Sequence, residues 1–320
     1  MTPEQAAWFA ETFDKLVGNV SQAIVGKDHA IRLALTCLLS EGHLLLEDVP
    51  GTGKTVLAKS IANTVQGTHS RVQFTPDLLP ADVTGGTVYD QRSGQFEVRR
   101  GPIFATIVLA DEINRASPKT QSALLEVMEE SQVTIDGTTY PVGPPFMVIA
   151  TQNPIEQAGT YRLPEAQLDR FLMRTALGYP DHDSTIRILA DASQKNRSAV
   201  VGPLITSNAV TEMATLAAGN HVDPAVLLYV SQIADATRAA PEVRLGMSIR
   251  GCMAFVRAAK TWAASQGRNY VLPDDVKLLA HPVTAHRLVL DAEAEFTGVT
   301  VASVVDRILS QVQPPTERAA

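Results

Sequence analysis

The chain has 320 residues, with 34 acidic and 27 basic side chains and a formal net charge of −7. This charge excludes a general electrostatic attraction to nucleic acids, and the length suffices for about two domains that fold without disulfides. The two cysteines, Cys37 and Cys252, lie far apart without metal-ligand spacing, which predicts reduced thiols and no zinc site.

The N-terminal segment has acidic residues early and lacks the basic and apolar regions of a signal peptide. The longest apolar stretches, such as 107–110 and 146–150, are far shorter than the roughly 20 residues that a membrane helix needs. We therefore expect a soluble, cytoplasmic protein without membrane insertion.

Short apolar runs alternate with helical patterns over the first 180 residues or so. This alternation predicts an α/β fold with a mainly parallel sheet between helices, and ligands of such sheets bind at the carboxyl ends of the strands. The predicted strands are His43–Glu47, Arg71–Phe74, Phe104–Ala110, Phe146–Thr151 and Phe171–Ala176.

Helical periodicity replaces the strand signals from about residue 183 onward. We therefore predict an α/β domain over residues 1–181 and an all-α domain over residues 182–320. Examples of the predicted helices are Ala225–Arg238, Ile249–Ser265 and Pro273–Ala280.

Two β-hairpins are predicted in addition to the sheet. Residues 87–102 alternate on both sides of a turn at 91–94, and residues 133–142 alternate around Asp136-Gly137. The first hairpin interrupts a helical region.

The stretch LLLEDVPGTGKTVLAKSIA, residues 44–62, has the strand, turn and helix order of a phosphate-binding loop. Glycines let backbone N–H groups close around phosphate oxygens at a helix N-terminus. Lys54 can reach the β- and γ-phosphates, and Thr55 offers a hydroxyl to Mg²⁺. The residues expected to contact the nucleotide are Pro50, Gly51, Thr52, Gly53, Lys54, Thr55 and Val56.

Asp48 occupies the first glycine position of the GxxxxGK[ST] consensus. A carboxylate facing the phosphate would repel it. We predict that the Asp48 carboxylate points away from the phosphate and caps the turn.

The apolar run 107–110 ends in Asp111-Glu112, at the predicted ligand edge of the sheet. Asp111 suits the Mg²⁺ shell, and Glu112 suits the base that orients the attacking water. The next strand ends near Asn153, whose amide can hold that water or sense the γ-phosphate. The alternative roles are a helix cap for the acidic pair and an ordinary turn residue for Asn153.

These motifs together resemble those of the AAA+ ATPases, and their individual residues resemble the MoxR family in particular. The likeness spans nearly the whole first domain. The stretches that carry it are IVGKDHAI (24–31), LEDVPGTGKT (46–55), QFTPDLLPADVTG (73–85), GPIFATIVLADEINRASPKTQSALLEVMEE (101–130), IATQNP (149–154) and LPEAQLDRF (163–171).

The resemblance implies backbone contacts to adenine from Val25 and Gly26, and Asn153 as the first sensor. It makes Arg170 an arginine finger that completes a neighbour's site, with Arg174 as the fallback, and so implies a ring of identical subunits, a hexamer in this family. The alternative for Arg170 is an ion pair with Asp169 or Glu165.

The stretch LGMSIRGCMAF (245–255) resembles the second-sensor helix of the family, which implies that Arg250 reaches back to the nucleotide. The chain departs from the family pattern at Met247 and Ile249, and near the finger Arg162 stands where proline is more usual. A surface arginine is the alternative role for Arg250.

The resemblance implies an Mg²⁺-dependent ATPase that remodels, matures or assembles protein clients, with von Willebrand A domain proteins as partners. Three alternatives stay open at this point: a DNA-directed motor, a magnesium-chelatase-like motor subunit, and a nucleotide-gated binding module without turnover. The acidic charge disfavours nucleic acid as the partner.

Overall fold

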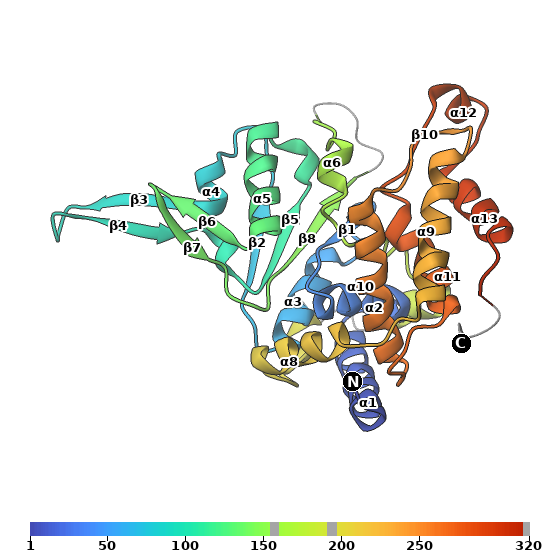
Figure 1. Ribbon diagram of the computed structural model, residues 1–320. Helices are drawn as coiled ribbons and strands as arrows, with labels where there is room; N and C mark the ends of the chain where they lie inside the picture. The colour runs from blue at the N-terminus through green and yellow to red at the C-terminus, as the bar shows by residue number, and fades with distance from the viewer. Residues whose placement is uncertain (154–159, 191–196, 316–320) are drawn as a thin grey trace.

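The computed structural model describes residues 1–153, 160–190 and 197–315 (Figure 1). Within them, five parallel strands form a sheet in the order β2-β5-β8-β1-β9, which confirms the predicted α/β fold. The strand expected from Phe104 begins only at Ile107, because residues 102–104 form a 3₁₀ turn. The strands of this sheet are β1 Leu44–Glu47, β2 His69–Gln73, β5 Ile107–Asp111, β8 Met147–Gln152 and β9 Met173–Thr175.

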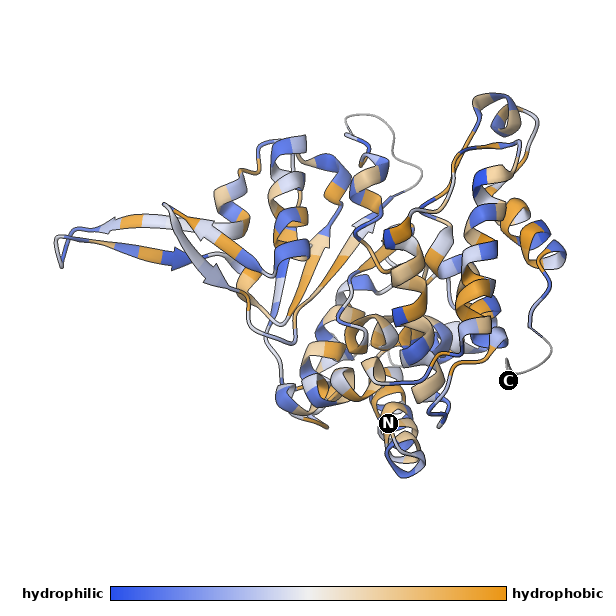
Figure 2. Ribbon diagram, viewed as in Figure 1, coloured by the Kyte–Doolittle hydropathy of each residue, from blue (hydrophilic) through white to orange (hydrophobic). Residues whose placement is uncertain are grey.

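The central strands β1, β5 and β8 are buried on both faces, and alternate residues enter two separate cores. Leu44 and Leu46 enter one core with the first three helices, and Leu45 enters the other. Figure 2 shows β5 and β8 as largely apolar ribbon. The helices of the first core are α1 Pro3–Ser21, α2 Asp28–Leu39 and α3 Lys54–Thr64, and those of the second are α4 Pro80–Thr84, α5 Pro118–Glu130 and α6 Glu165–Leu168.

The rest of the described chain is mainly helical, with one small antiparallel ribbon. Its α10 begins and ends at the predicted residues. The elements are α7 His182–Ala190, α8 Ser207–Ala218, α9 Pro224–Ala239, β10 Val243–Leu245, α10 Ile249–Ser265, α11 Pro273–Thr284, β11 Val289–Leu290, α12 Ala292–Phe296 and α13 Val301–Gln311.

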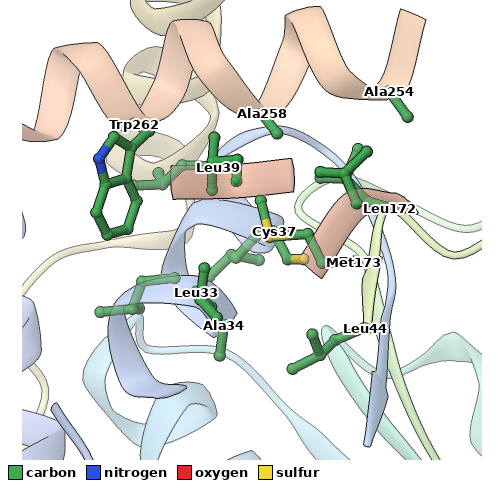
Figure 3. Packing of buried hydrophobic residues seen from close by; sticks show 14 of the residues in the cluster. Leu33, Ala34, Cys37, Leu39, Leu44, Leu172, Met173, Ala254, Ala258 and Trp262 are labelled. Carbon is green, nitrogen blue, oxygen red and sulfur yellow. The ribbon is translucent and has the colours of Figure 1, made fainter. Parts of the chain in front are cut away.

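The helical part shares the first core with the α/β part. Figure 3 shows α10 side chains, including Ala258 and Trp262, lying over Leu39 and Cys37 of α2. Apolar contact is continuous from α1 and α2 to α10. The predicted boundary between residues 181 and 182 stays a prediction.

Both predicted hairpins form. The first joins β3 Gly85–Asp90 to β4 Gln95–Arg100 and projects from the body of the molecule (Figure 1). The second joins β6 Gln132–Ile135 to β7 Thr138–Pro141 through Asp136 and Gly137, which both have positive φ. Among the described residues, none of the helices combines the length and apolar character needed to cross a bilayer.

Candidate functional site

The predicted phosphate loop lies between the end of β1 and the start of α3. Gly51 and Gly53 have φ values of +85° and +98°, which favour glycine. Gly53 is the N-cap of α3, and no side chain caps this helix. Among the described residues, nothing lies within 4 Å of where a Cβ at Gly51 would be, so they leave the loop open on that side. First-turn N–H groups of a helix have no intrahelical acceptor and can bind an anion.

The Lys54 side chain folds back onto the start of the phosphate loop. Its Nζ donates to the carbonyls of Val49 (2.9 Å) and Asp48 (3.1 Å). Both acceptors are neutral carbonyls, and no carboxylate of the described residues forms an ion pair with Lys54. A triphosphate on the loop would offer this group a stronger, charged acceptor.

The buried Asp48 carboxylate points away from the loop interior, as predicted. Its Oδ1 accepts from the Val49 N–H (2.9 Å), which caps the turn. Its Oδ2 accepts from the N–H groups of Leu177 (2.8 Å) and Gly178 (2.9 Å). Asp48 therefore ties the loop to the segment between β9 and α7.

Asp111 lies at the carboxyl end of β5 and is nearly buried. Its Oδ1 accepts from the Thr151 hydroxyl (2.7 Å), and its Oδ2 accepts from Arg71 Nη2 (2.6 Å). The Glu112 N–H donates to the same Thr151 oxygen (2.8 Å). One buried hydroxyl therefore fixes both acidic residues.

Glu112 has a φ of +56°, a left-handed conformation that is uncommon for a residue with a side chain. Its Oε2 accepts from Gln73 Nε2 (2.8 Å) and pairs with Arg115 Nε (3.2 Å). These contacts hold the carboxylate at the sheet edge. Strain at such a position is typical of functional sites.

Arg71, Gln73 and Thr151 belong to this site, although sequence patterns did not predict them. Register places Gln73 opposite Asp111, and Thr151 follows on the strand on the other side of β5. The available signal was that polar residues end neighbouring predicted strands, where side chains of parallel strands meet.

The segment predicted to contact adenine lies beside the phosphate loop. Ile24 Cδ1 is 3.6 Å from where a Cβ at Gly53 would be, so the turn containing Val25 and Gly26 is adjacent to the loop. A Cβ at Gly26 would lie 2.2 Å from Ser184 Oγ of α7. Three distant parts of the chain therefore meet around the loop.

Asn153 directly follows β8, between the strands that lead to the loop and to Asp111. Pro154 of the same motif lies outside the described residues. The carboxyl edge of the sheet thus collects the loop, the acidic pair and Asn153.

The donor chemistry at this edge suits Mg²⁺, which takes oxygen ligands and keeps several from phosphate and water. Thr55 contributes a hydroxyl and Asp111 a carboxylate. Among the described residues, no group of three or more His, Cys, Asp or Glu side chains forms a ready-made metal centre. A cation here would depend on a bound phosphate for part of its shell.

Arg170 lies at the opposite, amino edge of the sheet. It pairs with Glu129 at 2.9 Å, and not with Asp169 or Glu165, the partners that its alternative role would require. Those acids pair with Arg287 and Arg244 instead.

His43 defines this amino edge. It precedes β1, its Nε2 bonds the Met128 carbonyl (2.9 Å), and its Nδ1 accepts from the Val148 N–H (3.0 Å) at the start of β8. Burial lowers its pKa to about 4, so it is neutral.

Arg250 does not reach back to the phosphate loop of its own chain, which corrects that part of the sequence interpretation. It pairs with Glu129 at 2.5 Å, beside Arg170. The physical reason is the position of α10: its N-cap Ser248 donates to Asp169 (2.7 Å), which holds the start of the helix beside Arg170. The fallback finger, Arg174 on β9, pairs with Glu47 of β1 at 2.8 Å.

Comparison with known proteins yields two family matches and several long relatives. The ATPase family associated with various cellular activities (AAA) matches residues 43–173, and the AAA lid domain matches residues 235–308. "Chaperone MoxR1" of Mycobacterium tuberculosis is 40% identical, over 96% of this chain and 84% of its own. "Protein MoxR" of Paracoccus denitrificans is 33% identical, over 96% and 97%.

Two further comparisons extend over nearly the full chain. "Uncharacterized protein YeaC" of Bacillus subtilis is 44% identical over 96% of both chains. The crystal structure of a "putative ATPase" from Cytophaga hutchinsonii superposes with a TM-score of 0.91 at 38% identity, covering 98% of both chains.

Proposed function

This chain belongs to the MoxR family of AAA+ ATPases, and from that premise we propose that it hydrolyses ATP with Mg²⁺ in a ring of identical subunits to remodel protein clients. We propose that this remodelling takes place in the cytoplasm and that the helical part acts as the lid of the AAA+ domain. The proposed ring has six subunits, as is usual for the family.

The observation that carries the proposal is the division of the predicted site between two edges of one sheet. The phosphate loop, Asp111 and Glu112 lie at the carboxyl edge, whereas Arg170 and Arg250 lie at the amino edge. Strands rise about 3.3 Å per residue, so β5 separates the edges by roughly 15 Å.

The two arginines therefore suit the triphosphate of a neighbour better than that of their own subunit. A contact in which one face of a subunit meets a different face of the next is heterologous, and it closes into a ring when the rotation permits. This geometry supports the ring in the proposal.

In the proposed mechanism, the loop amides and Lys54 bind the phosphates, and Thr55 with Asp111 would hold Mg²⁺. The ion, when bound, supplies positive charge against the phosphate oxygens. Glu112, held by Gln73 and Arg115, orients the attacking water and accepts its proton.

Asn153 helps to place that water. Arg170 and Arg250 of the neighbour offset the charge that develops on the transferred phosphoryl group.

The β3–β4 hairpin is the proposed client contact. It extends from the body (Figure 1) and exposes Tyr89 by 53% and Phe96 by 74%. Their rings contact each other, with centroids 5.2 Å apart. Exposed apolar side chains on a projecting ribbon suit a protein client, and von Willebrand A domain proteins are our candidates for that client.

The test of the proposed function is ATP turnover and client capture with two variants. We expect Lys54→Ala to lose ATP binding and Glu112→Gln to bind ATP without turnover, so that only Glu112→Gln retains clients in ATP. Mass spectrometry of the retained proteins should then give different sets for the two variants. Absence of adenine-nucleotide binding by the folded wild type in calorimetry would refute the proposal.

A further inference from the structure

Glu129, near the end of α5, holds two arginines from distant parts of the chain. Its Oε2 pairs with Arg170 Nη2 at 2.9 Å, and its Oε1 pairs with Arg250 Nη2 at 2.5 Å. Arg170 follows α6, whereas Arg250 lies in the first turn of α10. Each carboxylate oxygen thus holds one guanidinium group, and the two groups lie side by side.

The backbones that carry these arginines are fixed relative to each other. Ser248, the N-cap of α10, donates to Asp169 Oδ2 (2.7 Å), directly before Arg170. The buried Arg287 donates to Asp169 Oδ1 (2.7 Å) and to the Phe171 carbonyl (2.7 Å). The finger segment and the lid helix therefore form one unit, and Glu129 bridges the side chains that this unit presents.

Both guanidinium groups stay available to an anion. Arg170 and Arg250 have side-chain exposures of 28% and 46%, and with Glu129 they line a cavity of about 670 Å³. Two guanidinium groups against one carboxylate leave a net positive charge among these three groups.

We propose that Glu129 is a positioning residue for ATP hydrolysis at the neighbouring subunit, because it holds Arg170 and Arg250 together in the geometry that one triphosphate requires. The inference rests on the proposed function, which brings that triphosphate to this face. Without the carboxylate, the two like charges repel and the long side chains spread over many rotamers. Each would then have to be ordered again in every catalytic cycle.

The first test compares Glu129→Gln with Glu130→Gln. Glu130 is the next residue of the same helix end, and its exposed carboxylate contacts Gln132. A glutamine at 129 can accept from one arginine, but its NH₂ group faces the other. We expect Glu129→Gln to lower kcat by about 10- to 100-fold and to leave the KM for ATP unchanged, because the two arginines offset charge that develops only in the transition state.

Glu129→Asp keeps the charge on a side chain that is one methylene shorter, and we expect an intermediate kcat. Glu130→Gln should match the wild type. If Glu129→Gln also matches the wild type, the inference is overturned while the proposed function stands.

The second test mixes subunits. A Lys54→Ala subunit lacks a working loop but carries intact arginines, so it should restore turnover to Arg170→Ala subunits. The same mixing should rescue Glu129→Gln. Rescue of Arg170→Ala without rescue of Glu129→Gln would show that Glu129 acts within its own subunit and would reject the inference alone. No rescue of Arg170→Ala would reject the shared site and the inference with it.

Discussion

Replacing Thr151 with valine tests the link between Asp111 and Glu112. The hydroxyl of this buried residue donates to Asp111 (2.7 Å) and accepts from the Glu112 N–H (2.8 Å). Valine has nearly the same shape, so it creates no cavity but leaves both groups without that partner. A hydrogen bond to a charged group contributes about 1.5–3 kcal/mol, and a buried unpaired amide costs about 1–3 kcal/mol.

We therefore expect Thr151→Val to lower the free energy of unfolding by about 2–4 kcal/mol, since the two effects overlap in part. Urea titration followed by circular dichroism measures this change as a lower midpoint at an unchanged slope. Turnover should fall by at least about 10-fold, because Glu112 loses the bond that supports its left-handed backbone.

Thr151→Ser is the matched control, because it keeps the hydroxyl and removes only a methyl group. It should lose about 1 kcal/mol of stability and retain most of the turnover. If Thr151→Val unfolds within about 0.5 kcal/mol of the wild type and hydrolyses ATP at the same rate, the hydroxyl does not hold the acidic pair and our reasoning is wrong.

Three other predictions concern a buried histidine, the two cysteines and two glycines. Burial lowers the pKa of His43 from 6.5 to about 4, so between these pH values the unfolded chain binds a proton there that the native protein does not. The urea midpoint should therefore fall as the pH drops from about 6.5 towards 4, and a flat profile would contradict this prediction. A thiol reagent should modify half-buried Cys252 slowly in the native protein and buried Cys37 only after unfolding, which absorbance before and after unfolding would show. Equal modification rates of the two thiols in the native protein would contradict the burial of Cys37 in the core. Gly18→Ala, in an open helical position, should raise the free energy of unfolding by about 0.5–1 kcal/mol. Gly26→Ala should lower it and weaken ATP binding, because Gly26 has a φ of +73° and a Cβ there would lie 2.2 Å from a hydroxyl. Urea titration and calorimetry measure the two effects, and a Gly26→Ala protein more stable than Gly18→Ala would contradict the prediction.

Local patterns predicted the features that depend on neighbouring residues. The glycine loop, the Asp136-Gly137 turn and the start of α10 after Ser248 each follow from residues within a few positions of one another. The outward turn of Asp48 followed from charge alone, since a carboxylate facing a phosphate loop would repel its ligand.

Contacts between distant residues could not be predicted in this way. Thr151 and Asp111 lie 40 positions apart, and Glu129 lies 121 positions before Arg250. The sequence contains these charges and hydroxyls but does not say which of them pair. The register of the sheet and the packing position of α10 determine the pairs. For Arg250 the missing information was the position of its helix, which places the residue beside Glu129 and away from the phosphate loop of its own chain.

The apolar contact between α2 and α10 has a practical consequence for expressing parts of this chain. A fragment that stops at residue 181 would keep its phosphate loop but would leave Leu39 and its neighbours on α2 without the cover that Ala258 and Trp262 provide (Figure 3). Such a fragment should self-associate or precipitate, although its sheet is complete. Anyone dividing the protein for study would do better to co-express the two halves than to purify either one alone.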